Sequence, residues 1–338
     1  MDTIILKLGH KCNFNCVYCS QEHLINNGRE WEGLSPSLFS FLDNHRGKGV
    51  TIKFYGGEPL LYFDYIKQIV EKYQEDFSYM LISNGSLLRK PMVEVFNRFK
   101  VRFLLSHDGT STKKTKRKDV LKSKRLVGLF QALKHLEFIS VISLYNQRID
   151  HLYDFFRDKG FKDTRVNLVW IVNNGTREQR KASLIDLEGY RRGVRATIAR
   201  QEILRKGINC DYQQEYNHIR HFLKIILNQK EHTKKCSSCG YFSGMKKIVI
   251  DRQGYVYDCQ NQEEIIGILD DGEVDKKDKI KTPLDLGCEE CRYNSFCEKV
   301  CPNMSIQGAE LWCALYRITF EEVFKYIAQK GKELYGKV

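Results

Sequence analysis

The sequence lacks a long hydrophobic run and a secretion signal. No apolar stretch approaches the roughly 18 residues that a membrane span needs. The N-terminus, Met1-Asp2-Thr3, has neither the basic segment nor the cleavage pattern of a signal peptide. We therefore predict a cytoplasmic protein with no membrane partner. Because thiols stay reduced in the cytoplasm, its 12 cysteines indicate metal or cluster ligands rather than disulfides.

Cysteines are absent from the whole stretch between Cys19 and Cys210, whereas eight lie in residues 236–338. This shift predicts a domain boundary near residue 230. We predict a barrel domain at 1–206, a helical linker at 207–235 that includes a helix at 212–229, and a cysteine-rich domain at 236–338. A C-terminal helix at 311–334 closes the last domain. Cys210 matches no ligand spacing and is interpreted as a small buried or loop residue.

Charge and composition restrict the class of protein. A chain of 338 residues with 42% hydrophobic and 12% aromatic residues suits a globular enzyme of two or three domains. The net charge of +13 is compatible with nucleic acid or an acidic peptide. However, the densest basic run, residues 113–118, contains no aromatic side chain and is interpreted as a solvated loop. Nucleic acid is therefore not expected as a partner.

Apolar runs alternate with amphipathic segments along the first 206 residues. The predicted strands are residues 3–8, 51–55, 79–83, 101–106, 138–143 and 166–172. The predicted helices are residues 35–44, 64–73, 91–99, 123–134, 151–159 and 186–206. This alternation indicates parallel βαβ units, so we predict an α/β fold, a partial (β/α)6 TIM-like barrel followed by a small cysteine-rich domain. In such barrels the chemistry lies at the C-terminal ends of the strands.

The first predicted strand is followed by the cysteine loop, residues 8–20. It carries Cys12, Cys16 and Cys19 in the spacing C-x3-C-x2-C. Soft thiolates in groups of three or four favour zinc, copper(I) or an iron–sulfur cluster. Three ligands rather than four leave one iron of a 4Fe–4S cube open, and an open metal position is reactive. The alternatives are a zinc knuckle without its fourth ligand, or three unrelated thiols.

Polar residues follow each of the next three predicted strands. The three segments are Gly56-Gly57-Glu58-Pro59, Ser83-Asn84-Gly85 and Ser106-His107-Asp108-Gly109. Paired glycines let a backbone approach a ligand closely, and the glutamate beside them can accept a hydrogen bond from an ammonium group. Each segment alone is compatible with an ordinary turn. Their occurrence together after the cysteine loop indicates a binding site.

Cys12, Cys16 and Cys19, with Tyr18 before the last cysteine, resemble the signature of radical S-adenosylmethionine (SAM) enzymes. The resemblance implies that the three thiolates hold a 4Fe–4S cluster and that SAM binds its open iron. It also implies cleavage of SAM to methionine and a 5′-deoxyadenosyl radical, which abstracts a hydrogen from the substrate. An external donor such as flavodoxin or ferredoxin would supply the electron.

The resemblance assigns further residues to SAM. By analogy with the family, Gly56, Gly57 and Glu58 bind the methionyl amino group, and Tyr18 lies in the same cofactor-binding region. Three residues after later strands match positions that contact the rest of SAM: Asn84, Ser106 and Arg117. Leu168, in the sixth predicted strand, matches the adenine pocket, and the alternative is a buried strand leucine.

The C-terminal cysteines form a second array, which runs Cys236-x2-Cys239, Gly254-x4-Cys259, Cys288-x2-Cys291-x5-Cys297-x3-Cys301 and then Cys313. From the spacing alone, two closed zinc sites and iron–sulfur clusters are equally compatible. A hairpin is predicted from 247–251 and 255–257, with Gly254 in its turn. The array resembles the SPASM domain of peptide-modifying radical SAM enzymes, although the gap from Cys301 to Cys313 is shorter than usual.

The SPASM resemblance implies two auxiliary 4Fe–4S clusters, three clusters in all. It assigns four ligands to the first auxiliary cluster, which are Cys236, Cys239, Cys259 and Cys301. It assigns four to the second, which are Cys288, Cys291, Cys297 and Cys313. Full ligation by four thiolates leaves no open iron, so these clusters are expected to serve electron transfer and scaffolding.

The resemblance spans roughly residues 3 to 320 and implies an oxidoreductase that abstracts a hydrogen from a peptide. We predict a maturase of a ribosomally made peptide (RiPP) that forms a crosslink. Because the first predicted strand begins at residue 3, we expect no N-terminal leader-binding domain, so leader recognition would be absent, use a separate protein, or use the barrel face.

Three alternatives to the crosslinking maturase remain. Sulfatase-maturating enzymes, which make formylglycine, carry an aspartate after the cysteine equivalent to Cys259. Here Gln260 stands instead and cannot act as a carboxylate base, and our hypothesis for the catalytic base is Asp258 or the solvent. The other two alternatives are a small-molecule radical SAM dehydrogenase and, from another class, a zinc-scaffolded nucleic-acid-binding protein.

Overall fold

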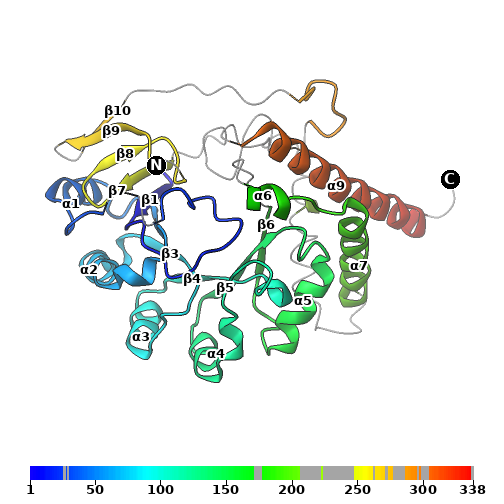
Figure 1. The fold of residues 1–338 in the computed structure, drawn as a ribbon, viewed down its shortest axis with the longest axis horizontal. Helices are drawn as coiled ribbons and strands as arrows, with labels where there is room; N and C mark the ends of the chain where they lie inside the picture. The colour runs from blue at the N-terminus through cyan, green and yellow to red at the C-terminus, as the bar shows by residue number, and fades with distance from the viewer. Residues whose placement is uncertain are drawn as a thin grey trace. The chain divides into compact units, whose positions relative to one another are not determined.

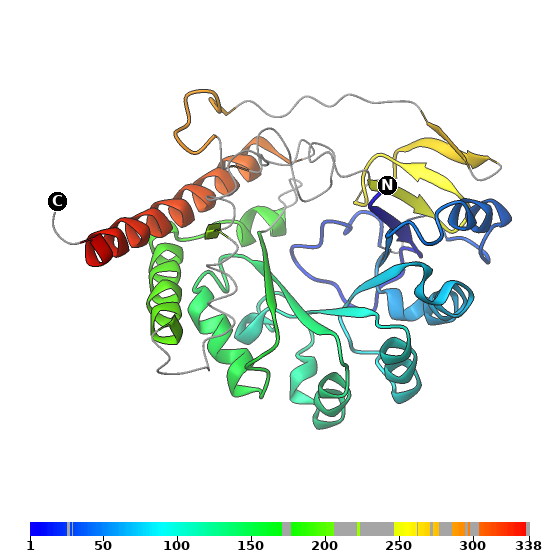
Figure 2. The same ribbon diagram turned by 180° about the vertical axis from the view of Figure 1, so that it is seen from behind.

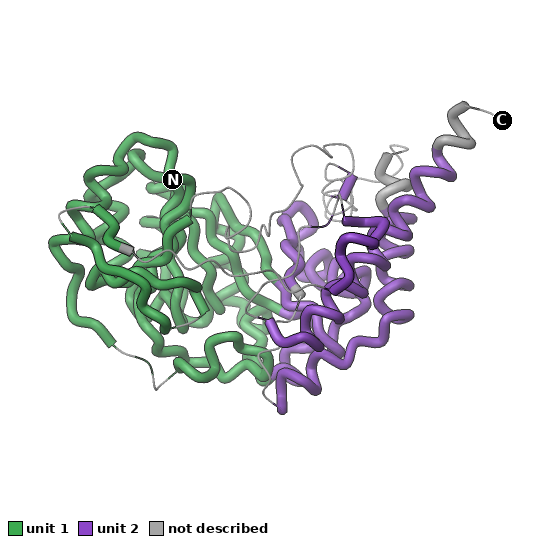
Figure 3. The backbone as a smooth tube through the Cα atoms, turned by 90° about the horizontal axis from the view of Figure 1, so that it is seen from above, with its two compact units in different colours: residues 1–107, 116–139, 237–282 green, residues 108–115, 140–236, 283–338 purple. Residues whose placement is uncertain are grey.

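The computed structural model describes residues 1–25, 28, 30–170, 177–205, 222–223, 247–261, 263–270, 273–276, 286–294, 297 and 304–335. The chain divides into two compact units, coloured separately in Figure 3. Unit 1 comprises Met1–His107, Lys116–Ile139 and Ser237–Thr282, and unit 2 comprises Asp108–Thr115, Ser140–Cys236 and Pro283–Val338. Within the described ranges, no helix is long and apolar enough to cross a membrane.

Six strands follow one another in chain order along the sheet (Figure 1). They are β1 (Thr3–Lys7), β2 (Thr51–Tyr55), β3 (Ser78–Ser83), β4 (Arg102–Ser106), β5 (Leu136–Ile142) and β6 (Val166–Trp170). The recorded pairings from β1 to β5 are all parallel. Each strand overlaps its predicted range, and the predicted α/β fold with a partial-barrel core is confirmed.

Helices alternate with these strands along the chain. They are α1 (Pro36–Asp43), α2 (Phe63–Tyr73), α3 (Lys90–Arg98), α4 (Lys124–Gln131), α5 (Ile149–Asp158), α6 (Arg177–Ala182), α7 (Leu187–Arg205) and α9 (Ile306–Tyr335). Short 3-10 helices lie at Pro59–Tyr62 (η1), Gln74–Asp76 (η2), Gly109–Ser111 (η3) and Val120–Lys122 (η4). The helix predicted at 212–229 lies almost wholly outside the described residues.

The start of α1 shows how the sequence sets a helix boundary. The Ser35 hydroxyl accepts a hydrogen bond from Leu38 N at 3.1 Å, and Pro36 occupies the first turn, where its missing N–H costs nothing. In unit 1, helices α1 to α4 lie along one face of the sheet (Figures 1 and 2). The cysteine loop lies on the other face, which therefore holds the candidate site.

Strand β2 shows how the two faces of the sheet differ. Ile52 and Phe54 are fully buried, and the Phe54 ring stacks on Tyr79 of β3 at 6.1 Å between ring centroids. Lys53 and Tyr55 alternate with them and remain partly exposed. Because successive strand side chains point to opposite faces, Lys53 and Tyr55 point to the face that carries the cysteine loop.

Four further strands extend the sheet beyond β1. They are β7 (Lys247–Asp251), β8 (Tyr255–Tyr257), β9 (Ile265–Asp270) and β10 (Glu273–Lys276), and the full order is β10-β9-β8-β7-β1-β2-β3-β4-β5-β6. The predicted hairpin of β7 and β8 is confirmed, with Gly254 at a φ of +92° in its turn. Strand β7 pairs in parallel with β1 and so covers an edge that would otherwise be open.

This pairing places residues 247–276 in the same compact unit as the N-terminal strands. The division by compactness therefore differs from the domain limits predicted at 1–206, 207–235 and 236–338. Those limits follow the cysteine motifs rather than the strand pairing, and they stay a prediction.

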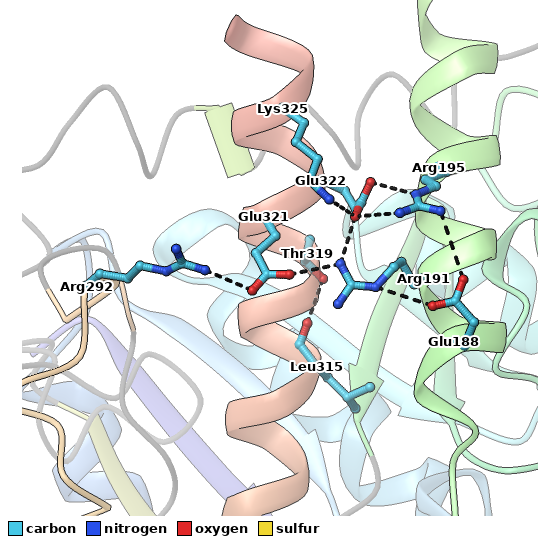
Figure 4. A network of polar contacts seen from close by, with 9 residues as sticks. All are labelled: Glu188, Arg191, Arg195, Arg292, Leu315, Thr319, Glu321, Glu322 and Lys325. Carbon is cyan, nitrogen blue, oxygen red and sulfur yellow. Dashed lines mark hydrogen bonds and ion pairs between the residues drawn. The ribbon is translucent and has the colours of Figure 1, made fainter.

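In unit 2, helices α7 and α9 are joined by ion pairs centred on Glu322 (Figure 4). The Glu322 carboxylate, 5% exposed, accepts hydrogen bonds from Arg195 and Arg191 at 2.8 Å and from Lys325 at 2.9 Å. Burial alone raises a carboxyl pKa, but these three cations more than offset it and lower the pKa of Glu322 to about 2. The charged form of Glu322 therefore stabilises the helix pair.

Candidate functional site

The cysteine loop is pinned by backbone hydrogen bonds to the residues that follow β2. Gly57 N donates to Gly9 O at 3.0 Å, and Glu58 N donates to Lys11 O at 2.8 Å. A Cβ added at Gly57 would collide with Lys11 O, and one at Gly56 with Gly9 O. Gly56 also has a φ of +149°, which favours glycine. The sequence predicted that these glycines let the backbone approach a ligand, and in the structure they lie against the backbone of the cysteine loop.

A tyrosine and a glutamate hold the beginning of the same loop. The Tyr62 hydroxyl donates to the Glu30 carboxylate at 2.9 Å and accepts from Lys11 N at 3.0 Å. His10 N donates to Glu30 Oε1 at 3.1 Å. The predictions included neither Tyr62 nor Glu30, because their contacts with the loop span 20 to 51 positions of sequence.

The three thiols of the cysteine loop are partly buried. Burial raises the pKa of Cys12 and raises that of Cys19 to about 11, although backbone N–H groups partly oppose the effect. Phe14 N donates to Cys12 Sγ at 3.5 Å, and Cys19 N donates to Cys16 O at 3.1 Å. Burial thus favours the protonated thiols of Cys12 and Cys19, whereas a metal binds the thiolates and opposes this effect.

Among the described residues, no group of three or more His, Cys, Asp or Glu side chains lies together as a site for one metal ion. A 4Fe–4S cube binds each thiolate to a different iron, so its ligand set is not a single-ion site. Three soft thiols within eight residues, with an N–H donor already on Cys12 Sγ, fit the chemistry of such a cluster.

Glu58 lies beside the cysteine loop with its carboxylate almost fully buried, 1% exposed. Its Oε1 accepts from Ser83 Oγ at 2.7 Å and Leu60 N at 3.0 Å, and its Oε2 accepts from Asn84 N at 2.8 Å. Burial raises its pKa, and these three donors oppose the rise. A carboxylate offers about four acceptor positions, so roughly one remains for a further donor. The hydrogen bond from Leu60 N also makes Glu58 the N-cap of η1.

A ring of amides and hydroxyls joins the cysteine loop to the end of β3. Asn84 Nδ2 donates to Asn13 Oδ1 at 2.9 Å, and Asn13 Nδ2 donates to Ser86 Oγ at 2.9 Å. Ser86 Oγ donates to Asn84 Oδ1 at 2.7 Å and closes the ring. Asn13 directly follows Cys12, so the ring fixes the loop at its first thiol. Asn84 was predicted as a site residue, whereas Asn13 and Ser86 were not.

Arg117 is turned into the site, with 9% of its surface exposed. Its Nη1 donates at 2.8 Å to both Tyr18 OH and Ser106 Oγ. Its charge acts to lower the pKa values of Cys12 and Glu58. The structure thus brings three predicted residues together. The solvated-loop prediction holds for the lysines around it, which are exposed: Lys113, Lys114, Lys116 and Lys118.

The loop after β8 lies near the same face. Cys259 is buried, and its Sγ accepts from Asn261 N at 3.5 Å. Tyr55 of β2 donates to Asn261 Oδ1 at 2.7 Å. The pKa of Tyr55 is raised by burial and then by the thiols of Cys19 and Cys259, so its hydroxyl lies between two cysteine-bearing loops.

Two further predicted site residues in the described part of the chain are Asp258 and Leu168. Asp258 is partly exposed, and its backbone N donates to Glu264 O at 3.3 Å. Leu168 lies in β6 of unit 2 and is partly exposed rather than fully buried. Both assignments stay predictions.

The second cysteine group lies in unit 2. Cys288, Cys291, Cys297 and Cys313 are partly buried, and Cys291 N donates to Cys288 O at 3.2 Å. Burial raises the pKa of Cys313, and the neighbouring Arg317 opposes the rise. A cavity of about 770 Å³ is lined in part by Cys313 and Arg317. The remaining predicted cysteines lie outside the described residues: Cys210, Cys236, Cys239 and Cys301.

Comparison with known proteins gives one family and several relatives. The family model of the radical SAM superfamily matches residues 6–182. The chain is 25% identical over 125 residues to the radical SAM cyclopropyl synthase TigE of Paramaledivibacter caminithermalis, covering 31% of this chain and 26% of that protein. It is 28% identical over 176 residues to a GTP 3′,8-cyclase of Nautilia profundicola, covering 47% and 54%. The chain thus spans about a quarter to a half of the length of these curated relatives.

Two solved structures share the fold over most of this chain. Native anSMEcpe with bound AdoMet aligns with a TM-score of 0.71 at 17% identity and covers 98% of this chain and 99% of that one. SuiB of Streptococcus suis bound to the precursor peptide SuiA aligns with a TM-score of 0.56 at 16% identity, covering 88% and 71%. At these identities the likeness shows the fold.

Proposed function

This chain belongs to the radical SAM superfamily, and on that premise we propose that it is an oxidoreductase that modifies a peptide. Membership of the family implies SAM and a 4Fe–4S cluster as cofactors. It also argues against the zinc-scaffolded nucleic-acid-binding protein that the sequence left open. One observation carries the proposal. The cysteine loop is bonded to the segment of Glu58, whose buried carboxylate keeps an acceptor position beside Cys12.

Different residues of unit 1 would bind the cluster and SAM. Cys12, Cys16 and Cys19 would ligate the cluster, and Glu58 would accept a hydrogen bond from the ammonium group of SAM. When bound, the cluster and SAM supply a 5′-deoxyadenosyl radical that abstracts a hydrogen from the substrate. Arg117 is anchored by two hydrogen bonds that its Nη1 donates, and its guanidinium charge would attract the carboxylate of SAM.

Asn84 and Ser106, both assigned to SAM binding, hold neighbouring residues of the site in place. Asn84 uses its side chain to hold the cysteine loop through Asn13, so its contribution to SAM binding is partly one of position. Ser106 holds Arg117. Tyr18 does the same from the cysteine loop, so movement of that loop would also move the arginine.

Two auxiliary 4Fe–4S clusters complete the proposal. Cys236, Cys239, Cys259 and Cys301 are assigned to the first, and Cys288, Cys291, Cys297 and Cys313 to the second. Two observations support this assignment. The spacing of the C-terminal cysteines resembles that of SPASM domains, and Asn261 N donates a hydrogen bond to Cys259 Sγ. The clusters would accept an electron from the substrate and pass it to an external electron-transfer protein such as flavodoxin or ferredoxin.

For the substrate we favour a ribosomally made peptide that acquires a crosslink. The proteins that share this fold include SuiB, which was solved with a precursor peptide, and anSMEcpe, which was also solved with a bound peptide. Gln260 in place of an aspartate weighs against formylglycine formation, and Asp258 remains the proposed base. A separate leader-binding protein remains a proposed partner.

A nucleotide substrate is the second candidate. It is favoured by one observation, the 28% identity to a GTP 3′,8-cyclase over 47% of this chain. That match covers only part of the chain, whereas the peptide-bound structure of anSMEcpe aligns over 98% of it. The two substrates are separated by direct assay.

The test uses the anaerobically reconstituted, reduced protein with SAM. We expect 5′-deoxyadenosine to form, and to form faster when a short peptide encoded beside the gene is added. Mass spectrometry of that peptide should show a loss of two hydrogens. A protein with full iron content that leaves SAM intact under these conditions contradicts the proposal, and consumption of GTP in place of peptide supports the second candidate.

A further inference from the structure

Lys53 of β2 lies on the face of the sheet that carries the cysteine loop. Within the described part of the chain, no carboxylate lies within ion-pair distance of Lys53 Nζ. Its recorded polar contact is a long hydrogen bond of 3.4 Å to Gln260 Oε1, and it lies 5.2 Å from the centroid of the Tyr55 ring. The side chain is partly buried between these neighbours.

The electrostatic surroundings of Lys53 make this position costly for a cation. Burial lowers its pKa to about 8, and the nearby cation Lys247 adds to the effect. The amine therefore still carries its charge at neutral pH, with an amide rather than a carboxylate beside it. A poorly solvated charge without an opposite partner destabilises the fold. Such residues are candidates for sites where a ligand supplies the missing charge.

The position of Lys53 suits contact with a substrate. Gln260 and Asn261 directly follow Cys259, and Gln21 lies two residues after Cys19. Gln21 Nε2 donates to Gln260 O at 3.2 Å, which ties the two cysteine-bearing loops together beside Lys53. Lys53 thus lies on the face of the sheet where the loop of the proposed radical-forming site and the loop of Cys259 meet.

We propose that Lys53 is a specificity-determining residue that binds a carboxylate of the substrate peptide. This inference rests on the proposed function, since it takes the substrate to lie between the cysteine loop and Cys259. The neutral Gln260 leaves the charge of Lys53 available, whereas an aspartate at that position would pair with it. A single ammonium matches a monoanion, while phosphate groups are held by several cations or by forked guanidinium groups.

The test measures peptide binding to the anaerobic holoenzyme by calorimetry. The probes are a capped alanine pentapeptide with a central glutamate, the same peptide with glutamine, and the glutamine peptide with a free C-terminus. We expect at least one carboxylate-bearing peptide to bind about tenfold or more tightly than the neutral one, as for a hydrogen bond to a charged group. Tighter binding of the glutamate peptide would show that Lys53 binds a side-chain carboxylate, and tighter binding of the peptide with the free C-terminus would show that it binds a C-terminal carboxylate.

Variants separate binding from structure. Lys53→Met should abolish the preference, Lys53→Arg should keep it, and Lys67→Met on the exposed face of α2 should leave it unchanged. A purely structural role would change the melting temperature of Lys53→Met without changing the preference. Equal binding of all three peptides to the wild type, or a preference retained in Lys53→Met, overturns the inference.

The same preparation is assayed for 5′-deoxyadenosine, which keeps the two claims apart. SAM cleavage without any carboxylate preference overturns the role of Lys53 and leaves the proposed function standing. If the protein leaves SAM intact but shows a carboxylate preference that depends on Lys53, the proposed function is overturned and the binding role of Lys53 stands.

Discussion

At the scale of single residues, Glu58 shows how one side chain serves both fold and proposed chemistry. Three donors already occupy its carboxylate, and burial would otherwise favour the neutral acid. The hydrogen bonds keep the group oriented toward the cysteine loop while one acceptor position stays open. Neutralising the group should therefore affect stability modestly and SAM binding strongly.

We expect Glu58→Gln to weaken SAM binding at least tenfold, since an amide offers no charge to an ammonium group. Its NH₂ would also face backbone donors, which should cost about 1–3 kcal/mol of unfolding free energy. Equilibrium dialysis of SAM with the reconstituted protein and thermal unfolding check the two effects. The control is Glu71→Gln on the exposed face of α2. SAM affinity within twofold of the wild type would show that Glu58 does not bind SAM.

Residues in compact motifs could be predicted, and residues joined by distant contacts could not. The cysteine loop and Gly56-Gly57-Glu58 stand out in the sequence because their chemistry depends on close spacing. Asn13 and Ser86 do not, because their bond joins side chains 73 positions apart and depends on how two loops meet. Lys53 was predicted only as part of a strand, since the absence of a carboxylate near it among the described residues appears only in three dimensions.

At the scale of elements, the segment after β2 forms a support for the cysteine loop. Its two glycines have no room for a side chain because the loop backbone passes against them. The sequence predicted that the glycines approach a ligand, and it did not predict their contact with the loop backbone, since a glycine pair alone does not say which backbone comes near. Incorporation of the iron–sulfur cluster should therefore depend on Gly56 and Gly57, which do not bind metal themselves.

Gly57→Ala should displace the cysteine loop, because its Cβ would meet the carbonyl oxygens of Lys11 and His10. We expect about four fewer irons per chain after anaerobic reconstitution, the content of one 4Fe–4S cluster. The matched control is Gly128→Ala in α4, where nothing lies within 4 Å of the added Cβ. That change should stabilise the protein by about 0.5–1 kcal/mol. Iron content equal to the wild type in Gly57→Ala contradicts the role given to the glycine.

The pair of α7 and α9 gives a pH prediction. The pKa of Glu322 is about 2 in the folded protein, below its ordinary value of 4.5. Its contribution is therefore fully present above pH 4.5 and is lost as pH falls toward 2. Glu322→Gln should lower the unfolding free energy by about 3 kcal/mol at pH 7 and by less than half of that at pH 3.

Urea unfolding followed by circular dichroism at both pH values measures the difference. Glu188→Gln is the control, because Glu188 is exposed and lies 3.6 Å from Arg191. An exposed pair of this kind should contribute less than about 1 kcal/mol. A Glu322→Gln effect that is equal at pH 7 and pH 3 would mean that the ion pairs do not cause the stabilisation.

At the scale of the whole molecule, the sequence predicted the strand–helix alternation but not the pairing of strand β7 with β1. Periodicity reports which faces are buried, so the strands and helices of the barrel could be located. It does not report that β7 pairs with β1, because that pairing joins segments about 244 positions apart, as for Thr3 and Lys247. The hairpin of β7 and β8 lies within the cysteine array in sequence and extends the N-terminal sheet in space, and the domain limits predicted from the cysteines stay a prediction.

The account as a whole depends on three thiolates that hold a cluster able to bind SAM. The most direct measurement is electron paramagnetic resonance of the reduced protein with and without SAM, combined with iron analysis. The account predicts about twelve irons per chain and a spectrum that SAM alters. It predicts about eight irons, and a spectrum insensitive to SAM, when Cys12, Cys16 and Cys19 are all replaced by alanine. A triple variant that keeps the wild-type iron content, or that still cleaves SAM to 5′-deoxyadenosine, would contradict it.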